Sequence, residues 1–244
     1  MTDEISQHFD EAFLRWFRER TEETWRRYQT RTFEEYVASR VGGRDWQQGT
    51  CWQGGLSEQE IATIEQHYDV RFPPDYRLFL QMLHCVDRPC VGAKYSDGET
   101  MTPATTALFY NWQTDAEALQ AAYAWLVEGL FFDVQQNDLW LQSWGEKPTT
   151  AEAQEARVRE LMNAAPRLIP VSGHRYLLAE PCEAGNPVLS IYQSDMIIYG
   201  VDLHDYFLTE FGTLIGGGRS YGSRLTQEKF EAYQTIPFWG EFLS

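Results

Sequence analysis

The chain has 244 residues, of which 43% are hydrophobic and 15% aromatic, and its formal net charge at pH 7 is −16. This length predicts one large domain or two small ones, and the apolar content excludes intrinsic disorder for most of the chain. The negative charge argues against nucleic acids and anionic membranes as partners, because phosphate binding depends on contacts with Lys and Arg. It instead favours fast association with a basic partner.

The N-terminal residues 3–29 predict an amphipathic helix with aromatic side chains on one face, namely Phe9, Phe13, Trp16 and Phe17. Such a helix either docks on a partner or membrane surface, or packs on the rest of the chain. Its arginines lie at helical spacing from glutamates, and this self-neutralisation favours the second interpretation. We assign residues 1–40 to an N-terminal helical region.

Residues 41–55 are rich in glycine and glutamine and are predicted to be a linker. Two tryptophans in it, Trp46 and Trp52, have two interpretations. They either clamp the linker onto the body of the protein or offer exposed aromatic side chains to a partner. The sequence leaves this choice open.

The segment LSEQEIATIEQHYDVRFPPDYRLFLQML, residues 56–83, predicts two consecutive helices. Ser57 and Glu60 match a capping box, in which each side chain accepts a hydrogen bond from the other residue's backbone amide. Pro73 and the proline that follows interrupt regular structure. A second helix is expected to begin near Asp75.

Residues 86–106 are expected to form an irregular loop that carries Asp97 and Glu99. Thr114 and Glu117 have capping-box spacing and predict the start of another helix.

Residues 131–134 and 139–141 predict a β-hairpin closed by a polar turn. A helix is expected from Thr149, and further helices after Gly200 and from Thr226. Four β-rich runs with short turns predict antiparallel strands at 168–171, 175–178, 188–192 and 196–199. Because helices and strands do not alternate as βαβ units, the fold class is predicted to be α+β.

No catalytic constellation emerges from the residues. Ser190, His174 and Asp195 lack a GxSxG context, and Gly216–Gly218 is not followed by the GK[ST] of a phosphate loop. Arg175 is interpreted as a structural bracket between adjacent strands.

The acidic and thiol side chains suggest no site either. Pairs such as Glu180 with Glu183 are expected by chance among 36 acids, and acid–base catalysis needs a buried carboxyl with a raised pKa. The cysteines, Cys51, Cys85, Cys90 and Cys182, lack the paired spacing of a zinc site, so we expect no metal and no other cofactor. With free thiols, no apolar N-terminal signal and no apolar run long enough to span a bilayer, we expect a cytoplasmic protein that does not enter a membrane.

Four further segments join residues 56–83 in a recognisable set: FYNW at 109–112, LWLQSWGEKP at 139–148, APRLIPVSGHRYL at 165–177 and GNPVLSIYQSDMIIYG at 185–200. Together they resemble the motifs of the SUKH superfamily, named from the yeast cell-wall regulators of the Smi/Knr type. The resemblance covers roughly residues 56–211. After the second helix the chain departs from the family pattern, with His84-Cys85-Val86 where an Asn-Gly turn is frequent.

The resemblance implies an α+β domain over residues 56–244, with a central, mostly antiparallel sheet and helices packed against it. Bacterial members are similar to immunity proteins, which bind and neutralise toxins exchanged between competing cells. Eukaryotic relatives act as interaction hubs. The matching motif positions imply structural roles and no active site: Leu56, Tyr76, Trp144, Gly145, Arg175, Asp195 and Gly200.

These arguments lead us to expect a non-enzymatic protein-binding domain of the immunity type, which blocks a toxin by occlusion. A basic toxin domain fits the acidic charge, because opposite charges accelerate encounter. The alternatives are a housekeeping interaction module without a toxin partner and a hydrolase that uses a carboxylate pair. Candidate partner-binding residues were chosen from predicted loops: Trp46, Trp52, Asp97, Glu99, Glu180 and Glu183.

Overall fold

A computed structural model of the chain describes residues 8–96 and 98–243. Helices and antiparallel sheets follow one another along this part of the chain, which confirms the predicted α+β class. The helices are α1 (Glu11–Arg26), α2 (Phe33–Ser39), α3 (Glu58–Tyr68), α4 (Pro74–Met82), α5 (Ala116–Gln136), η1 (Gln142–Trp144), α6 (Ala151–Ala164), α7 (Leu203–Glu210), α8 (Gln227–Gln234) and η2 (Trp239–Phe242). The strands are β1 (Gly43–Asp45), β2 (Cys90–Tyr95), β3 (Met101–Thr106), β4 (Leu168–Ser172), β5 (Arg175–Leu178), β6 (Val188–Tyr192) and β7 (Asp195–Gly200).

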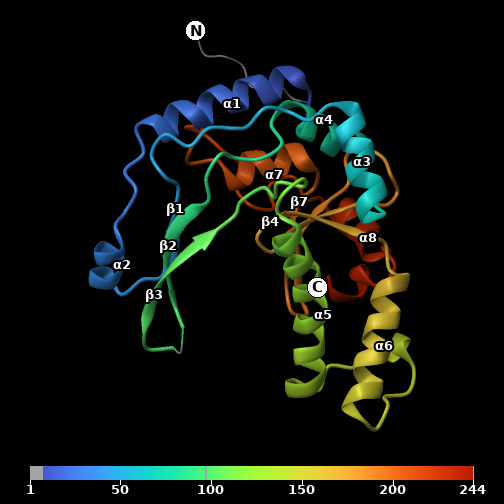
Figure 1. Cartoon of the computed structure of the whole chain (residues 1–244). Helices are drawn as coiled ribbons and strands as arrows, with labels where there is room; N and C mark the ends of the chain where they lie inside the picture. The colour runs from blue at the N-terminus through green and yellow to red at the C-terminus, as the bar shows by residue number, and fades with distance from the viewer. Residues whose placement is uncertain (1–7, 97, 244) are drawn as a thin grey trace.

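The strands form two sheets, where a single central sheet had been expected. One has three strands in the order β1-β2-β3, and the other is a four-stranded meander from β4 to β7. A bridge between Leu108 and Ser172 connects the chain after β3 to the edge of the meander. In Figure 1 the three-stranded sheet and α2 project to one side of the molecule, away from α5 and α6. We call this projecting part, residues 33–45, 90–96 and 98–106, the lobe, and the remaining described residues the body.

The four-stranded sheet separates two hydrophobic cores. Successive side chains of a strand point to opposite faces, so Leu177 enters one core while Tyr176 and Leu178 enter the other. The first core lies toward α1, α3, α4 and α7, and its largest side chains are aromatic, among them Phe17, Trp25, Phe79 and Phe207. The second core lies toward α5, α6 and η2 and includes Leu130, Trp144, Trp239 and Phe242. Three of the motif positions with implied structural roles, Leu56, Tyr76 and Trp144, are core residues.

The N-terminal helix packs on the body, as its self-neutralising charges had favoured. Phe13, Phe17 and Trp25 of α1 are fully buried, and the ring centroids of Phe17 and Phe207 are 4.8 Å apart. α1 is shorter than the predicted helix, and part of that prediction lies outside the described residues. The separate helix α2 follows it, beginning at Thr32 with a capping box that the sequence analysis did not identify.

The two-helix segment is confirmed in detail. The backbone amide of Ser57 donates to the Glu60 carboxylate at 2.8 Å, and the amide of Glu60 donates to the Ser57 hydroxyl at 3.3 Å. Pro74 is the first residue of α4, a position where its missing N–H leaves no hydrogen bond unmade. Before α3, the Leu56 amide donates to the carbonyl of Leu80 at 2.9 Å, so the segment closes on itself.

Two predictions between residues 86 and 141 are wrong. The expected irregular loop contains the hairpin of β2 and β3, whose strands pair in register from Cys90 with Thr106 to Tyr95 with Met101. The expected hairpin at 131–141 is absent, because α5 continues to Gln136 and the chain then forms the short helix η1.

Two local predictions also need correction. The first residue before α5 is Asp115, which makes no side-chain cap, so the capping box expected from Thr114 and Glu117 does not form. The predicted linker 41–55 contains strand β1, which pairs with β2. By contrast, the four strands of the meander and the helices near 203 and 227 agree with prediction to within one or two residues.

Candidate functional site

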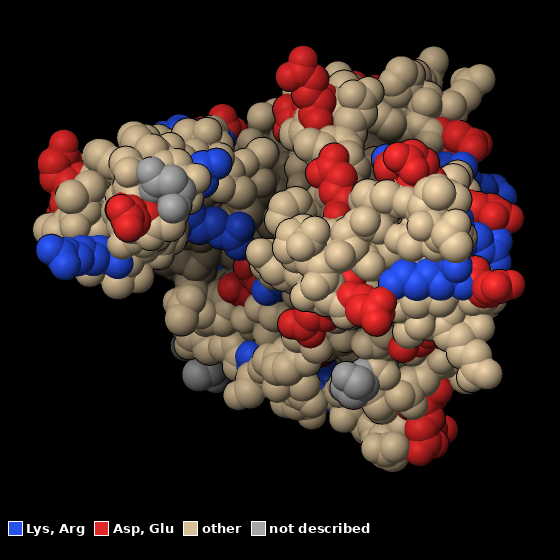
Figure 2. Space-filling view, turned by 90° about the horizontal axis from the view of Figure 1, so that it is seen from below, with Lys and Arg blue, Asp and Glu red and all other residues tan. Residues whose placement is uncertain are grey.

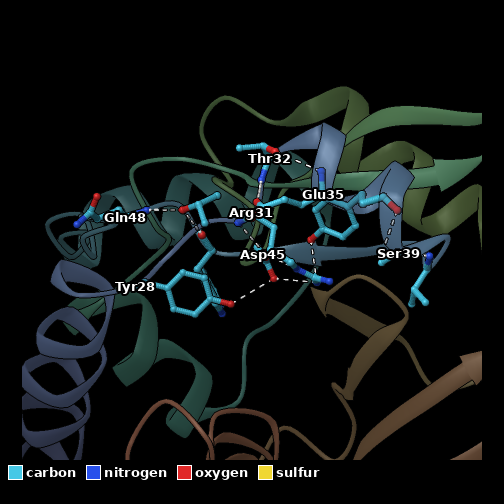
Figure 3. Close-up of polar contacts among 11 residues, drawn as sticks. Tyr28, Arg31, Thr32, Glu35, Ser39, Asp45 and Gln48 are labelled. Atoms are coloured by element: carbon cyan, nitrogen blue, oxygen red, sulfur yellow. Dashed lines mark hydrogen bonds and ion pairs between the residues drawn. The ribbon is translucent and has the colours of Figure 1, made fainter.

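The lobe is fixed to the end of α1 by the buried carboxylate of Asp45, at the end of β1 (Figure 3). The Asp45 side chain is 8% exposed and accepts three hydrogen bonds from Arg31: from the backbone amide at 3.0 Å, from Nε at 2.8 Å and from Nη2 at 3.1 Å. The Tyr28 hydroxyl donates to the same carboxylate at 3.3 Å. The Arg31 guanidinium also lies over the Tyr36 ring, 4.1 Å from its centroid. Residues from α1's end, α2 and β1 therefore meet at one carboxylate.

The charge states at neutral pH favour this network. Burial alone would raise the pKa of Asp45, but the hydrogen bonds from Arg31 outweigh it and hold the pKa below its usual value. Burial raises the pKa of the Tyr28 and Tyr36 hydroxyls, and the nearby Asp45 charge raises both further. The carboxylate is thus charged and both phenols are neutral, which is the combination that satisfies every hydrogen bond described here.

Further contacts hold the segments on either side of β1. The Thr30 hydroxyl donates to the Trp46 carbonyl at 2.8 Å and accepts from the Gln48 amide at 2.9 Å. At the far side of the lobe, the Tyr95 hydroxyl donates to the Arg40 carbonyl at 2.9 Å. The position of the lobe is therefore set by hydrogen bonds from several elements.

A cleft separates the lobe from the body. Figure 2 shows it as a hollow between the projecting part and the rest of the molecule, with Lys and Arg side chains on the lobe side. The cavity at its base has a volume of about 340 Å³ and is lined by side chains of both parts, including Arg44, Trp46, Leu108, Ser172 and Glu210. Arg44 of β1 lies 3.5 Å from the Glu210 carboxylate at the end of α7, so an ion pair crosses the cleft.

Arg175 lies on the body side of the same carboxylate. Its Nη1 donates to the Ser190 hydroxyl of the adjacent strand at 2.7 Å, which confirms the predicted bracket between strands. Its guanidinium lies 3.7 Å from the centroid of the Tyr199 ring, and its Nε is 3.9 Å from Glu210. Arg44 and Arg175 thus approach Glu210 from opposite sides of the cleft.

A larger cavity, of about 700 Å³, lies where the chain leaves β3 and enters α5. Its charged side chains include Asp87, Arg88 and Asp115. The Asp87 carboxylate is paired with Arg88 at 2.6 Å, and Asp115 accepts from the Asn111 amide at 2.9 Å. The Asp87 and Asp115 carboxylates therefore each have a hydrogen-bond or ion-pair partner close to them in the sequence.

Two other buried carboxylates, Asp75 and Asp133, fix loops in place. Burial raises the pKa of Asp75, but its oxygens accept hydrogen bonds from the backbone amides of Tyr76 and Gly185, each at 2.9 Å, and it lines neither cavity. Asp133 of α5 accepts from the Ser194 amide at 2.9 Å and so fixes the turn between β6 and β7. Both carboxylates therefore accept hydrogen bonds from backbone amides that lack a backbone carbonyl partner.

The described side chains form no metal centre, and two of the thiols are buried. Within residues 8–96 and 98–243, no three His, Cys, Asp or Glu side chains are grouped so as to hold a metal ion. Burial raises the pKa of the Cys85 and Cys90 thiols to about 12, which leaves them unreactive at neutral pH. In the same described part of the chain, no helix has the length and apolarity needed to cross a bilayer.

The structure decides the two open interpretations of the linker tryptophans. Trp52 is 6% exposed and its indole Nε1 donates to the Thr21 hydroxyl at 2.8 Å, so it is a core residue and not available to a partner. Trp46 is partly buried, with its ring 4.6 Å from that of Trp25 and 5.8 Å from that of Phe211. Both therefore clamp the predicted linker to the body, although Trp46 also lines the cleft.

The predicted acidic residues do not gather in one place. Glu99 is exposed near the start of β3, in the lobe, whereas Glu180 and Glu183 are exposed in the loop between β5 and β6, in the body. Asp97 lies outside the described residues. Arg44 and Glu210 were not predicted as site residues, because no local sequence motif marks either one and they meet only in the folded chain.

Comparisons with family models, with curated proteins and with solved structures return no match to this chain.

Proposed function

We propose that this chain is a non-enzymatic protein-binding domain, and that it acts as an immunity protein that occludes a toxin. The observation that carries the proposal is the preformed cleft between body and lobe; the Asp45 network fixes the lobe, and the Arg44–Glu210 pair crosses the cleft. A surface fixed before binding loses little conformational entropy when a partner is bound. The resemblance of the sequence motifs to the SUKH superfamily agrees with this role.

The net charge of −16 supports a basic partner. Nuclease domains carry positive charge where they hold phosphate, and an acidic inhibitor is steered toward such a surface. Association between complementary charges reaches about 10⁸–10⁹ M⁻¹s⁻¹ at low salt. A cytoplasmic location, where an immunity protein would meet an incoming nuclease, is part of the same proposal.

The proposal is tested by co-expression with the protein encoded by the reading frame adjacent to this chain's own. We expect the chain to protect cells from that protein and to form a complex with it whose association rate falls steeply with added salt. A toxic neighbour that is neither bound nor neutralised would refute the immunity role. Stable binding to a host protein in the absence of any toxic neighbour would instead favour the housekeeping alternative.

A further inference from the structure

One face of the four-stranded sheet is only partly covered by the body. Cross-strand pairing aligns Arg175 with Ser190 and Ser190 with Ile197, so these three side chains share a face. Tyr192 and Tyr199 lie on the same face, because strand residues two apart point the same way. α7 packs against β7 and covers one end of this face. We call the other end, formed by Tyr192, Ile197, Tyr199 and Tyr221, the open sheet face.

The open sheet face exposes large apolar side chains. Tyr192 is 53% exposed, Ile197 36% and Tyr221 50%. Trp125 of α5, 41% exposed, extends the face at its margin, since its ring lies 5.7 Å from that of Tyr192. Aromatic side chains grouped in this way supply large contact areas at low cost in side-chain entropy.

Stacking contacts link the exposed Tyr221 ring to side chains of the sheet. The rings of Tyr199 and Tyr221 are stacked with centroids 5.7 Å apart and an interplanar angle of 28°. Arg175 lies against the ring of Tyr199 and is anchored by its hydrogen bond to Ser190. Arg175, Tyr199 and Tyr221 therefore form a stacked ladder that leads from the sheet to the surface.

The open sheet face adjoins the cleft and is bordered by acids. Glu210, which pairs with Arg44 across the cleft, is also the nearest carboxylate to Arg175, so the two surfaces meet there. Asp195 lies beside Tyr192 in the sheet, and Glu128 is one turn beyond Trp125 in α5. Neither acid has an ion-pair partner within residues 8–96 and 98–243, and both are exposed.

We propose that the open sheet face is the contact surface for a basic protein partner, with Tyr192, Ile197 and Tyr221 as its anchors. The inference rests on the proposed function and names the surface that performs it. Interface energy is concentrated in a few aromatic and arginine side chains surrounded by polar groups, and this face has that composition. The unpaired Asp195 and Glu128 select a partner that brings Lys or Arg, because each acid then gains an opposite charge. They also argue against a second copy of this chain, which would bring like charges to the contact.

The experiment measures binding of the purified product of the adjacent reading frame to wild type and to paired variants. The double variant Tyr192→Ser with Ile197→Ser removes two anchors that contribute little to the core. Its matched control, Val37→Ser with Val41→Ser, changes two apolar side chains of the lobe that are 47% and 59% exposed and line no part of the cleft cavity. We expect the double variant to weaken binding at least about 30-fold and the control to change it less than about threefold. Asp195→Lys is compared with Glu146→Lys, an equal change of charge on an exposed loop before α6, and only the first is expected to slow association markedly.

The outcomes separate the two proposals. If wild type and the double variant bind equally well, the open sheet face is not the contact surface, while the immunity role stands. If wild type itself does not bind the neighbouring product, both proposals are overturned. Sedimentation of wild type alone supplies the remaining check, because dimers that the double variant abolishes would show that the face joins two copies of this chain and would refute the inference.

Discussion

Replacement of Trp52 by alanine tests whether this tryptophan is a structural clamp, as its burial indicates, or a binding residue. Its ring lies 5.1 Å from that of Phe109, 5.7 Å from that of Trp25 and 5.9 Å from that of Phe17. Its indole N–H donates to the hydroxyl of Thr21, which is fully buried. The substitution therefore removes both a central ring of the first core and a buried hydrogen bond.

The expected loss of stability follows from these contacts. A tryptophan side chain buries about 200 Å², and at about 25 cal/mol per Å² this corresponds to roughly 5 kcal/mol. Core Trp→Ala substitutions lower the free energy of unfolding by about 3–5 kcal/mol, in agreement with that estimate. For a chain of this size each kcal/mol lowers Tm by about 2–4 °C, so we expect Trp52→Ala to lower Tm by about 6–20 °C.

Two further variants make the test specific. Trp52→Phe keeps an aromatic ring and loses the donor to Thr21, and we expect it to lower the free energy of unfolding by about 1–2 kcal/mol. Trp125→Ala makes the same truncation at a 41% exposed position and should change stability by less than about 1 kcal/mol. Urea unfolding followed by circular dichroism gives all three values. If Trp52→Ala were no more destabilising than Trp125→Ala, the assignment of Trp52 to the core would be wrong.

Three other predictions concern buried groups and close backbone contacts. Burial lowers the pKa of His84 from 6.5 to about 4, so the unfolded chain binds the proton first and stability should fall by up to about 3 kcal/mol as pH falls from 6.5 to 4. His84→Asn, which tolerates the local φ of 58°, should remove this part of the pH dependence in urea unfolding. The pKa of Asp45 is lower in the folded chain than its value of about 3.9 in the unfolded chain, so the ionised carboxylate stabilises the fold above pH 3.9. The stability difference between wild type and Asp45→Asn should therefore shrink as pH falls below about 4. A difference that does not change with pH would argue against the network. A Cβ on Gly55 would lie 1.6 Å from the Gln81 carbonyl oxygen, whereas a Cβ on Gly54 would have no atom within 4 Å. In urea unfolding, Gly55→Ala should therefore lower the free energy of unfolding by about 3 kcal/mol or more, and Gly54→Ala should leave it almost unchanged.

Sequence motifs predicted local structure correctly where all the interacting residues are neighbours in the sequence. The capping box at Ser57 and Glu60 is formed by side chains and amides three residues apart, so the sequence contains every partner. The superficially similar pattern at Thr114 and Glu117 fails because the intervening Asp115 turns its carboxylate back to the amide of Asn111. A spacing alone does not decide which of two neighbouring polar residues captures an amide.

The false hairpin at 131–141 illustrates the limit of short windows. Its residues are β-rich when taken by themselves, yet the buried positions of α5 follow one another at Leu119, Leu126, Leu130 and Val134, which is helical spacing over four turns. A sequence window that starts at residue 116 and spans the whole helix shows this helical spacing, whereas a window of four residues is too short to show it. The length of the amphipathic stripe therefore outweighs local strand propensity here.

The hairpin of β2 and β3 was missed for a different reason. Its strands include Gly92 and Pro103 and expose much of their length, so neither composition nor alternation marks them. They form strands because β1 pairs along β2. The two backbones lie so close that a Cβ at Gly92 would be 2.0 Å from the backbone oxygen of Gly43, so this position requires glycine. The cleft and the open sheet face depend in the same way on residues that are distant in the sequence, so the sequence predicted the acidic character of the protein but neither of these two surfaces.

Charge and shape contribute to binding in separable ways. The surplus of acids acts over a distance of about one Debye length and raises the rate of encounter, but exposed charges add little to the stability of a formed contact. Lasting occlusion instead requires side chains that are ordered before the partner arrives, since each one ordered on binding costs about 0.5–1.5 kcal/mol. Here the Asp45 network fixes the lobe, and the ladder of Arg175, Tyr199 and Tyr221 orders the adjoining face. An acidic protein with mobile aromatic side chains would meet a basic toxin just as quickly and release it sooner, so the proposed occlusion depends on these two clusters being ordered before the toxin arrives.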